Sequence, residues 1–353
     1  MALTEIGSTT TPTAISDYSI SPVAPDSPRN QDETYWDNLK FTQYFGNYKA
    51  IAKIKKAIDG YATWVIGKGY VTNPEDQVDL DHVTGWGEDT FNSILWNSIV
   101  TKKINGDSFS EIIRDTDSGI LLNLKPLNPQ YMRTVVNRKG RIIRYEYRTT
   151  AGSEKSGDKR EIVVKYEPSE ILHLCNNRVV DEMHGVSDVE AVQWIVEFQE
   201  EAVRDLRKLM HRNGVVRVIE IDMDNPAKLA LYKVQWKDAI EKGDVLLLPK
   251  GIAEAKDWHG TIDFQGILAV IEYLDSLFYM TIGVPRVILG GAENSIEASS
   301  KIGTLNFEQV YQREQTELEA DIWNQLGIKI TFNKPASLME NVQDAEAAST
   351  SQT

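Results

Sequence analysis

Cysteine is nearly missing from this sequence: Cys175 is the one cysteine among 353 residues, so no disulfide can form within the chain. Basic residues are scarce, with 38 Lys and Arg against 52 Asp and Glu and a formal net charge of −14. A protein that binds nucleic acid by neutralising phosphates should be basic, so the composition argues against that class. Long apolar runs are missing too, because Arg286 interrupts the most apolar stretch, near 276–290. We expect a soluble, non-secreted protein of about two domains.

Signatures of nucleotide and calcium sites are incomplete. Gly67-Lys68-Gly69 has the look of a phosphate loop, but neither Ser nor Thr follows the lysine and the upstream glycine is missing. Asp79 and Asp81 alternate like the start of an EF-hand, yet Val83 and Thr84 stand where that motif needs an acidic or amide side chain and a glycine. Neither segment predicts a site.

Three potential soft metal ligands, His173, Cys175 and His184, lie within twelve residues. The first two are two residues apart on a predicted strand, and no fourth ligand has the spacing of a metal site. Buried or edge positions in a sheet explain these residues better. We expect no metal, no cofactor and no catalytic residue.

Hydrophobic periodicity predicts an α+β protein, because spacings of three and four residues alternate with a period of two. The predicted helices are 48–61, 91–99, 187–213, 225–242, 263–282 and 301–326, and the predicted strands are 108–114, 120–124, 141–148, 162–166, 215–221, 245–249 and 252–258. The first four strands are expected to form an antiparallel meander. Ser187 and Glu190 have the spacing of a capping box at the start of a long helix, and Gly327 should end the last one.

Five short segments carry a family resemblance. They are 105–112 (NGDSFSEI), 124–129 (LKPLNP), 168–174 (PSEILHL), 185–187 (GVS) and 282–290 (IGVPRVILG). In this order and at these separations, across about Tyr35 to Ile330, they resemble the portal proteins of tailed bacterial and archaeal viruses. The last segment is similar to the family's hGVPxxhLG string, and the first to its hGNAYxEI string.

The resemblance implies a portal fold that assembles as a ring, with a wing of helices and antiparallel sheet, a two-helix stem and a small β-α-β-β clip. Its parts would be a flexible N-terminal arm at 1–33, the first part of the wing at 34–186, stem helices at 187–213 and 263–283, a clip at 214–262, a tunnel loop at 284–300, a wing helix and strand at 301–332 and a flexible C-terminal tail at 333–353. Gln199 interrupts the apolar stripe of the first stem helix, where it either contacts a neighbouring subunit or has no role.

The resemblance further implies a virion protein that is not an enzyme. It would form a homo-dodecameric ring at one capsid vertex, assembled in the host cytoplasm, for genome packaging, head–tail joining and genome ejection. Its partners would be its own copies, the major capsid protein, the terminase large subunit, a head–tail adaptor and viral double-stranded DNA, which passes without sequence-specific binding; no membrane is involved. Between Asp257 and Ser300 the sole Lys or Arg is Arg286, so a ring of such segments would surround DNA with negative charge.

Position and charge indicate which residues would carry each task. Those assigned to the tunnel loop in the DNA channel are Glu293, Asn294 and Glu297, and those that supply stem charge are Asp263, Glu272 and Asp275. Those assigned to docking at the clip are Asp238, Glu241, Lys242 and Asp244.

Two other functions stay open. One is another head–tail structural protein, such as an adaptor with a similar sheet, which would not need a small module between two long helices. The other is a metal-dependent nuclease that uses scattered carboxylates such as Asp76, Asp79 and Asp81. Cleavage of DNA that depends on a divalent ion would distinguish the nuclease.

Overall fold

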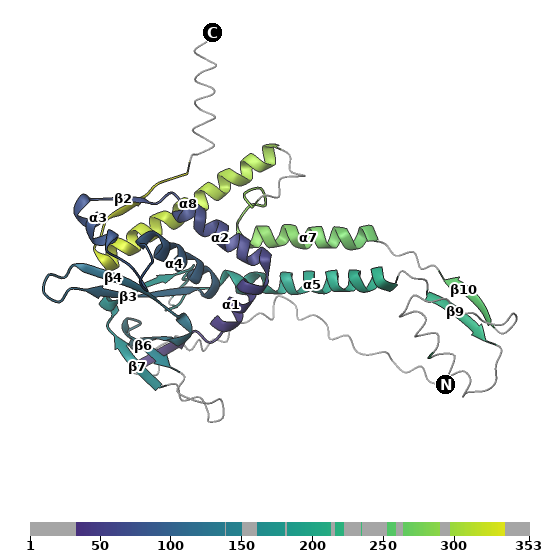
Figure 1. Cartoon of the computed structure of the whole chain (residues 1–353), viewed down its shortest axis with the longest axis horizontal. Coiled ribbons are helices and arrows are strands. Elements are labelled where there is room, and N and C mark those ends of the chain that lie inside the picture. The colour runs from purple at the N-terminus through teal and green to yellow at the C-terminus, as the bar shows by residue number, and fades with distance from the viewer. Residues whose placement is uncertain are drawn as a thin grey trace, which may run out of the picture. The chain divides into compact units, whose positions relative to one another are not determined.

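The computed structural model describes residues 33–137, 139–149, 161–180, 182–212, 216–221, 234, 253–258, 264–289 and 297–335. The chain divides into two compact units. The large unit comprises 1–193 and 279–353, and the small unit comprises 194–278. Both combine helices with antiparallel strand pairs, so the fold class is α+β as expected (Figure 1).

The described helices of the large unit are α1 (Phe41–Ala50), α2 (Ala52–Ile66), α3 (Pro74–Asp81), α4 (Phe91–Asn105) and α8 (Glu297–Leu326). The prediction of one helix over 48–61 is wrong, because Ile51 has extended backbone angles (φ −99°, ψ 102°) and separates α1 from α2. The last long helix begins four residues earlier than expected and ends as predicted at Gly327. Gly327 has a φ of +75°, a conformation that glycine adopts easily because it has no Cβ.

Strands of the large unit form three antiparallel sheets. One has the order β1 (Glu33–Asp37), β5 (Met132–Asn137), β6 (Ile142–Thr149) and β7 (Glu161–Tyr166); a second has the order β4 (Leu121–Leu127), β3 (Asp107–Arg114) and β8 (Ile171–Cys175); the third pairs β11 (Ile330–Phe332) with β2 (Tyr70–Thr72). The prediction of a single meander is therefore wrong, because a period of two marks a strand but does not encode its partner. Glu33, assigned to the flexible arm, belongs to β1.

The core of the large unit lies where α2 packs on α4 and α8, and where α4 packs on the sheet of β3, β4 and β8 (Figure 1). The predicted apolar stripe of α4 is confirmed, because all five of its members are buried: Phe91, Ile94, Leu95, Ser98 and Ile99. A second cluster, of Phe109, Met132, Tyr145 and Ile171, fills the space between the two larger sheets. These contacts hold β3 and β8 in place for the site described below.

The small unit contains most of the two long helices α5 (Asp188–Arg212) and α7 (Phe264–Ile282), with β9 (Val216–Ile221) and β10 (Ala253–Trp258) paired between them in sequence. These four elements match the predictions within two residues. The predicted helix at 225–242 and strand at 245–249 lie outside the described residues, apart from Val234. Among the described helices, none has both the length and the apolar character needed to cross a membrane.

Candidate functional site

Two of the residues predicted to supply charge lie on α7. Glu272 is exposed, and Asp275 is half-buried and accepts a hydrogen bond from Gln199 Nε2 of α5 (3.3 Å). Gln199 therefore has a hydrogen-bond partner in its own chain. The sequence suggested only a contact with a neighbouring subunit or no role for this residue. Asp238, Glu241, Lys242, Asp244, Asp263, Glu293 and Asn294 lie outside the described residues. Glu297 is the first residue of α8, and its side chain lies outside the described part as well.

Large apolar side chains are exposed on both helices of the small unit. Tyr273 is 66% exposed and Trp194 is 56% exposed. Among the described residues of the small unit, the exposed large apolar residues on these helices are Trp194, Phe198 and Val203 on α5, with Leu268, Val270 and Tyr273 on α7. Exposed apolar residues that occur singly are ordinary, so these six are notable for their number on two helices of one unit.

The start of α5 is fastened to β3 and β8 by a set of short contacts that we call the α5 junction: residues 104–107, 176 and 185–188. Asn176 N–H donates to Gly106 O (2.7 Å), and Gly185 N–H donates to Asp107 Oδ1 (2.9 Å). Ser187 Oγ donates to Ile104 O (2.5 Å) and accepts from Glu190 N–H (3.3 Å). Two of the five segments that carry the family resemblance thus meet here.

Only half of the predicted capping box forms. The Ser187 hydroxyl caps the helix start, but the Glu190 carboxylate accepts a hydrogen bond from Lys40 Nζ (2.5 Å). The Glu190 carboxylate bonds to Lys40 instead of the backbone N–H of Ser187 because a hydrogen bond to a charged ammonium group is stronger than one to a neutral amide.

A buried ionic network connects α4 to α8 next to this junction. Lys102 pairs with Glu314, and Lys103 Nζ lies 3.8 Å from Glu314 Oε2 and 3.2 Å from Asp188 Oδ2. Tyr61 Oη donates to Glu314 Oε2 (2.9 Å). Burial favours the neutral acid, but the two lysines outweigh it and lower the pKa of Glu314 below its ordinary value.

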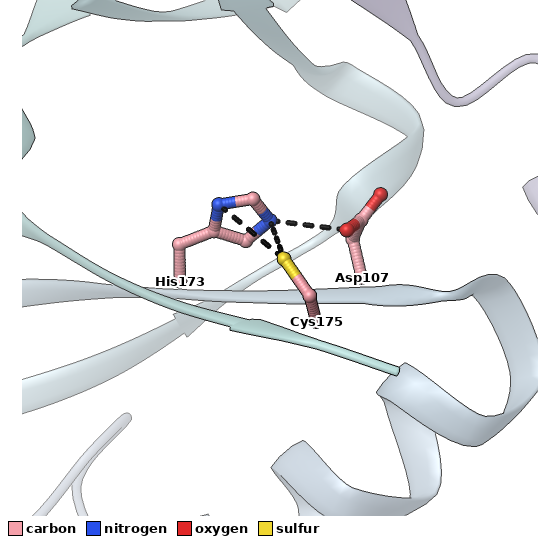
Figure 2. A group of neighbouring side chains, drawn as sticks. All are labelled: Asp107, His173 and Cys175. Atoms are coloured by element: carbon pink, nitrogen blue, oxygen red, sulfur yellow. Dashed lines mark hydrogen bonds and ion pairs between the residues drawn. The ribbon is translucent and has the colours of Figure 1, made fainter. Parts of the chain in front are cut away.

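Asp107, His173 and Cys175 form the one group of three metal-ligating side chains found in the described part of the chain (Figure 2). His173 Nε2 lies 3.1 Å from Asp107 Oδ1 and 3.3 Å from Cys175 Sγ. Burial by itself would lower the pKa of His173, but the acidic groups of Tyr145, Cys175 and Asp107 raise it well above the ordinary value. The three side chains could hold either a proton or a metal ion.

The sequence suggested His173, Cys175 and His184 as potential ligands, but buried or edge positions were the favoured explanation for all three; in the structure the first two lie together and His184 does not join them. His184 stacks on Trp36 instead, with ring centroids 3.5 Å apart. The missed residue is Asp107, which lies opposite Cys175 in the pairing of β3 with β8. Asp107 follows the glycine of the Asn105–Ile112 segment and could have been noticed there. Only the register of β3 and β8 shows that it lies beside Cys175.

The carboxylates of the nuclease alternative do not converge in this structure. Asp76, Asp79 and Asp81 all lie on the short helix α3, where Gln77 Nε2 donates to Asp81 Oδ1 (2.7 Å). They are absent from the single ligand group found among the described residues. No observation therefore favours that alternative.

A cavity of about 550 Å³ adjoins His173 and Cys175 within the large unit. Its wall includes Arg178, Arg313 and Asp321. Burial is the main cause that raises the pKa of Asp321 above its ordinary value. The cavity is polar enough to hold water beside the Cys175 thiol.

The fold defines a class: a body of antiparallel sheets and helices from which the chain runs through a long helix, a strand pair and a second long helix before it returns. No family model and no curated protein matches the sequence. Solved structures do match. They include the neck of a native gene transfer agent particle computed with C12 symmetry (TM-score 0.62, 14% identity, 89% of each chain covered) and the virion of the native particle (0.61, 13%, 90% of this chain and 89% of that one).

An HK97-family phage portal protein from Corynebacterium diphtheriae, solved at 2.9 Å, also matches. The TM-score is 0.53 at 14% identity, with 84% of this chain and 97% of that chain covered. The chain therefore has the fold of a phage portal protein, which confirms at the level of fold the resemblance found in its sequence.

Proposed function

We propose that this chain is a portal protein: a structural component of a virion that joins head to tail and surrounds the DNA channel. The observation that carries the proposal is the extent of the fold match. It covers at least 84% of this chain and at least 89% of each of the three solved chains, so no large part is left for another task. One of them is a particle neck with C12 symmetry, which supports twelve copies.

The proposal assigns a task to each part. Residues 34–186 and 301–332, both within the large unit, are the wing; α5 and α7 are the stem helices; and residues 214–262, which contain β9 and β10, are the clip. Residues 284–300, the last four of which begin α8, form the tunnel loop, with Glu293, Asn294 and Glu297 facing the channel. The clip docks the terminase and later the adaptor through Asp238, Glu241, Lys242 and Asp244.

Ring formation is supported by the exposed apolar side chains of the small unit. An isolated subunit would expose to water the six large apolar residues of the small unit on α5 and α7, and burying them against a neighbour is favourable by about 25 cal/mol for each Å². In a cyclic ring every copy has the same two neighbours, so the same apolar surface is buried in every subunit.

Passage of DNA is supported by the charge of α7 and its flanks. Across 264–289 the sole cation is Arg286, whereas Glu272 is exposed and Asp275 is half-buried. Such a wall offers DNA phosphates almost no fixed cation to bind, so the duplex is guided but not held. The energy for movement comes from a separate terminase ATPase, and the portal itself catalyses no reaction.

The first test is native mass spectrometry of the purified chain with negative-stain images of the same sample. Twelve chains of 39.8 kDa predict a particle of about 480 kDa with ring-shaped end views. Tyr273→Lys should abolish the ring. Trp323→Lys, which changes a 55% exposed aromatic residue of α8 in the large unit, should leave it intact. A chain that stays monomeric even with capsid and scaffold proteins, or rings that tolerate Tyr273→Lys, would refute the proposed assembly.

The second test concerns the channel. Glu293→Lys combined with Glu297→Lys should impair DNA packaging, because the new cations would bind passing phosphates, while ring assembly stays unchanged. A matched pair, Glu293→Gln with Glu297→Gln, removes the charge without adding cations and should have a smaller effect. Unchanged packaging in the lysine variant would overturn the channel assignment.

A further inference from the structure

The geometry points to a zinc site in the large unit formed by Asp107 Oδ1, His173 Nε2 and Cys175 Sγ, which we propose as a metal clamp between β3 and β8. The proposal does not rest on the portal function, since it concerns three side chains within one sheet. Carboxylate, imidazole and thiolate are the ligands that Zn²⁺ takes in proteins.

Strand register brings the three ligands together. Asp107 and Cys175 are partners across the antiparallel pairing of β3 and β8. His173 precedes Cys175 by two residues on β8, so both side chains point to the same face. Figure 2 shows the three side chains converging: one dashed line joins His173 Nε2 to Asp107, and two others join Cys175 Sγ to Nε2 and to Nδ1 of the same ring.

The separations suit a small tetrahedral ion. Zinc lies about 2.0–2.3 Å from its nitrogen, oxygen and sulfur ligands, which places tetrahedral donors about 3.3–3.6 Å apart. Nε2 lies 3.1 Å from Oδ1 and 3.3 Å from Sγ, and all three donor atoms lie within 4.8 Å of one another. The Nε2–Sγ separation already lies in that range, and a shift of a few tenths of an ångström would bring the Nε2–Oδ1 separation into it.

A catalytic triad would need a different arrangement. In a Cys-His-Asp triad the carboxylate binds one ring nitrogen and the other faces the thiol. Here the carboxylate contacts Nε2, and the thiol lies nearer to Nε2 (3.3 Å) than to Nδ1 (4.0 Å), while Nδ1 meets Tyr145 Oη at 3.0 Å. Two acidic groups that lie nearest to the same ring nitrogen are placed as ligands of one metal ion would be. They are not placed as the carboxylate and thiol of a catalytic triad.

Outer contacts hold the ligands in this geometry. With Tyr145 Oη as its partner, Nδ1 can carry the ring proton, which leaves the Nε2 lone pair free for a metal. Gly185 N–H donates to Asp107 Oδ1 (2.9 Å), and the Phe109 ring stacks on His173 at 4.5 Å. From α8, Gln325 hydrogen-bonds the His173 backbone N–H and C=O (2.8 and 3.0 Å).

The cavity beside His173 and Cys175 supplies the fourth position. Asp107 and His173 are buried, while Cys175 is half-buried at the cavity wall, so an ion can enter from that side. Water in the cavity would complete a tetrahedral set of three protein ligands.

The test is a Co²⁺ titration of the metal-free full-length chain, followed by displacement with Zn²⁺. Because Cys175 is the only cysteine, any thiolate-to-cobalt charge-transfer band reports this residue alone. We expect one Co²⁺ per chain with such a band, which Zn²⁺ abolishes, and no band in Cys175→Ser. His173→Gln should weaken Co²⁺ binding by at least 100-fold, and Tyr145→Phe by about 10- to 100-fold, because outer partners have effects of that size.

His82→Gln is the matched control: this exposed histidine lies on the flank of α3, outside the group, and should bind Co²⁺ like the wild type. Tyr145→Phe keeps the proposal testable if His173→Gln fails to fold. A folded wild type without the band refutes the site, as does bound Co²⁺ without thiolate absorption. A band that His173→Gln and Tyr145→Phe both leave unchanged also refutes it.

Discussion

A single methyl group added at Gly106 should break the α5 junction. Gly106 has a φ of +95°, and a Cβ built there would lie 2.2 Å from the carbonyl oxygen and 2.6 Å from the carbonyl carbon of Gly185. Both atoms belong to the backbone of the segment that leads into α5, so neither can rotate away as a flexible side chain would. Gly106→Ala must therefore separate β3 from the start of α5.

The expected loss has two parts. An L-residue at positive φ costs about 1–2 kcal/mol. Forcing extra volume into a packed site costs about 1–3 kcal/mol. Together they predict a loss of about 2–5 kcal/mol in the free energy of unfolding, a large share of the roughly 5–15 kcal/mol that holds a typical protein folded.

Two control variants separate these parts. Gly140 has a φ of +77° with no atom within 4 Å of an added Cβ, so Gly140→Ala should show the backbone cost alone. Gly185 is not among the residues with positive φ, yet its Cβ would lie 2.1 Å from Gly106 O, so Gly185→Ala should show the steric cost alone. Urea unfolding of the full chain, followed by circular dichroism under matched assembly conditions, measures all three. If Gly106→Ala loses no more stability than Gly140→Ala, the junction argument fails.

Three further predictions concern buried polar groups. Glu314→Gln should cost about 3–5 kcal/mol in urea unfolding because it leaves Lys102 buried without its anion, whereas Lys102→Met should cost less because Glu314 keeps Lys103 and Tyr61; the reverse order would contradict this account. The pKa of Glu314 is lower in the folded chain than in the unfolded chain, so the contribution of this carboxylate to the free energy of unfolding is complete above its unfolded-state pKa of about 4.5 and is lost as the pH falls through the folded value. Between pH 6 and pH 3 the stability of Glu314→Gln should therefore fall less steeply than that of the wild type. Parallel curves for the two proteins would contradict this prediction. Ser187→Ala should cost about 0.5–2 kcal/mol and speed amide exchange at the start of α5, because the helix loses its cap; unchanged exchange there would show that the cap is unimportant.

Helices and strands were largely predictable because their signals are local. The stripe from Phe91 to Ile99 repeats at helical spacing, and every member of it is buried. The break at Ile51 was not predictable, since both α1 and α2 continue the same apolar rhythm and only the packed structure bends the chain there. The start of α8 was placed four residues late, because the small polar residues before Lys301 carry no apolar stripe.

The candidate sites were less predictable than the helices and strands, because their contacts join residues far apart in the sequence. The residues chosen for the channel and the clip were chosen by charge and position, and all of them stay predictions. Among the described ones, Asp275 was chosen for its charge, but its contact with Gln199 came only from the pairing of α5 with α7. The spacing of His173 and Cys175 on one strand was taken as a reason against a metal site, because the sequence does not show that Asp107 joins them from 66 residues away along the chain.

By itself, the sequence determined the acidic charge, the order of two long helices around a small module, and the short segments that resemble portal proteins. These are properties of composition and of neighbours along the chain, which periodicity and spacing report directly. The tertiary structure alone decided how seven strands divide between the two larger sheets, which lysines pair with Glu314, and which third side chain faces His173. Such contacts depend on register and packing between distant segments, and a pattern that repeats every two or every 3.6 residues holds no information about its partner.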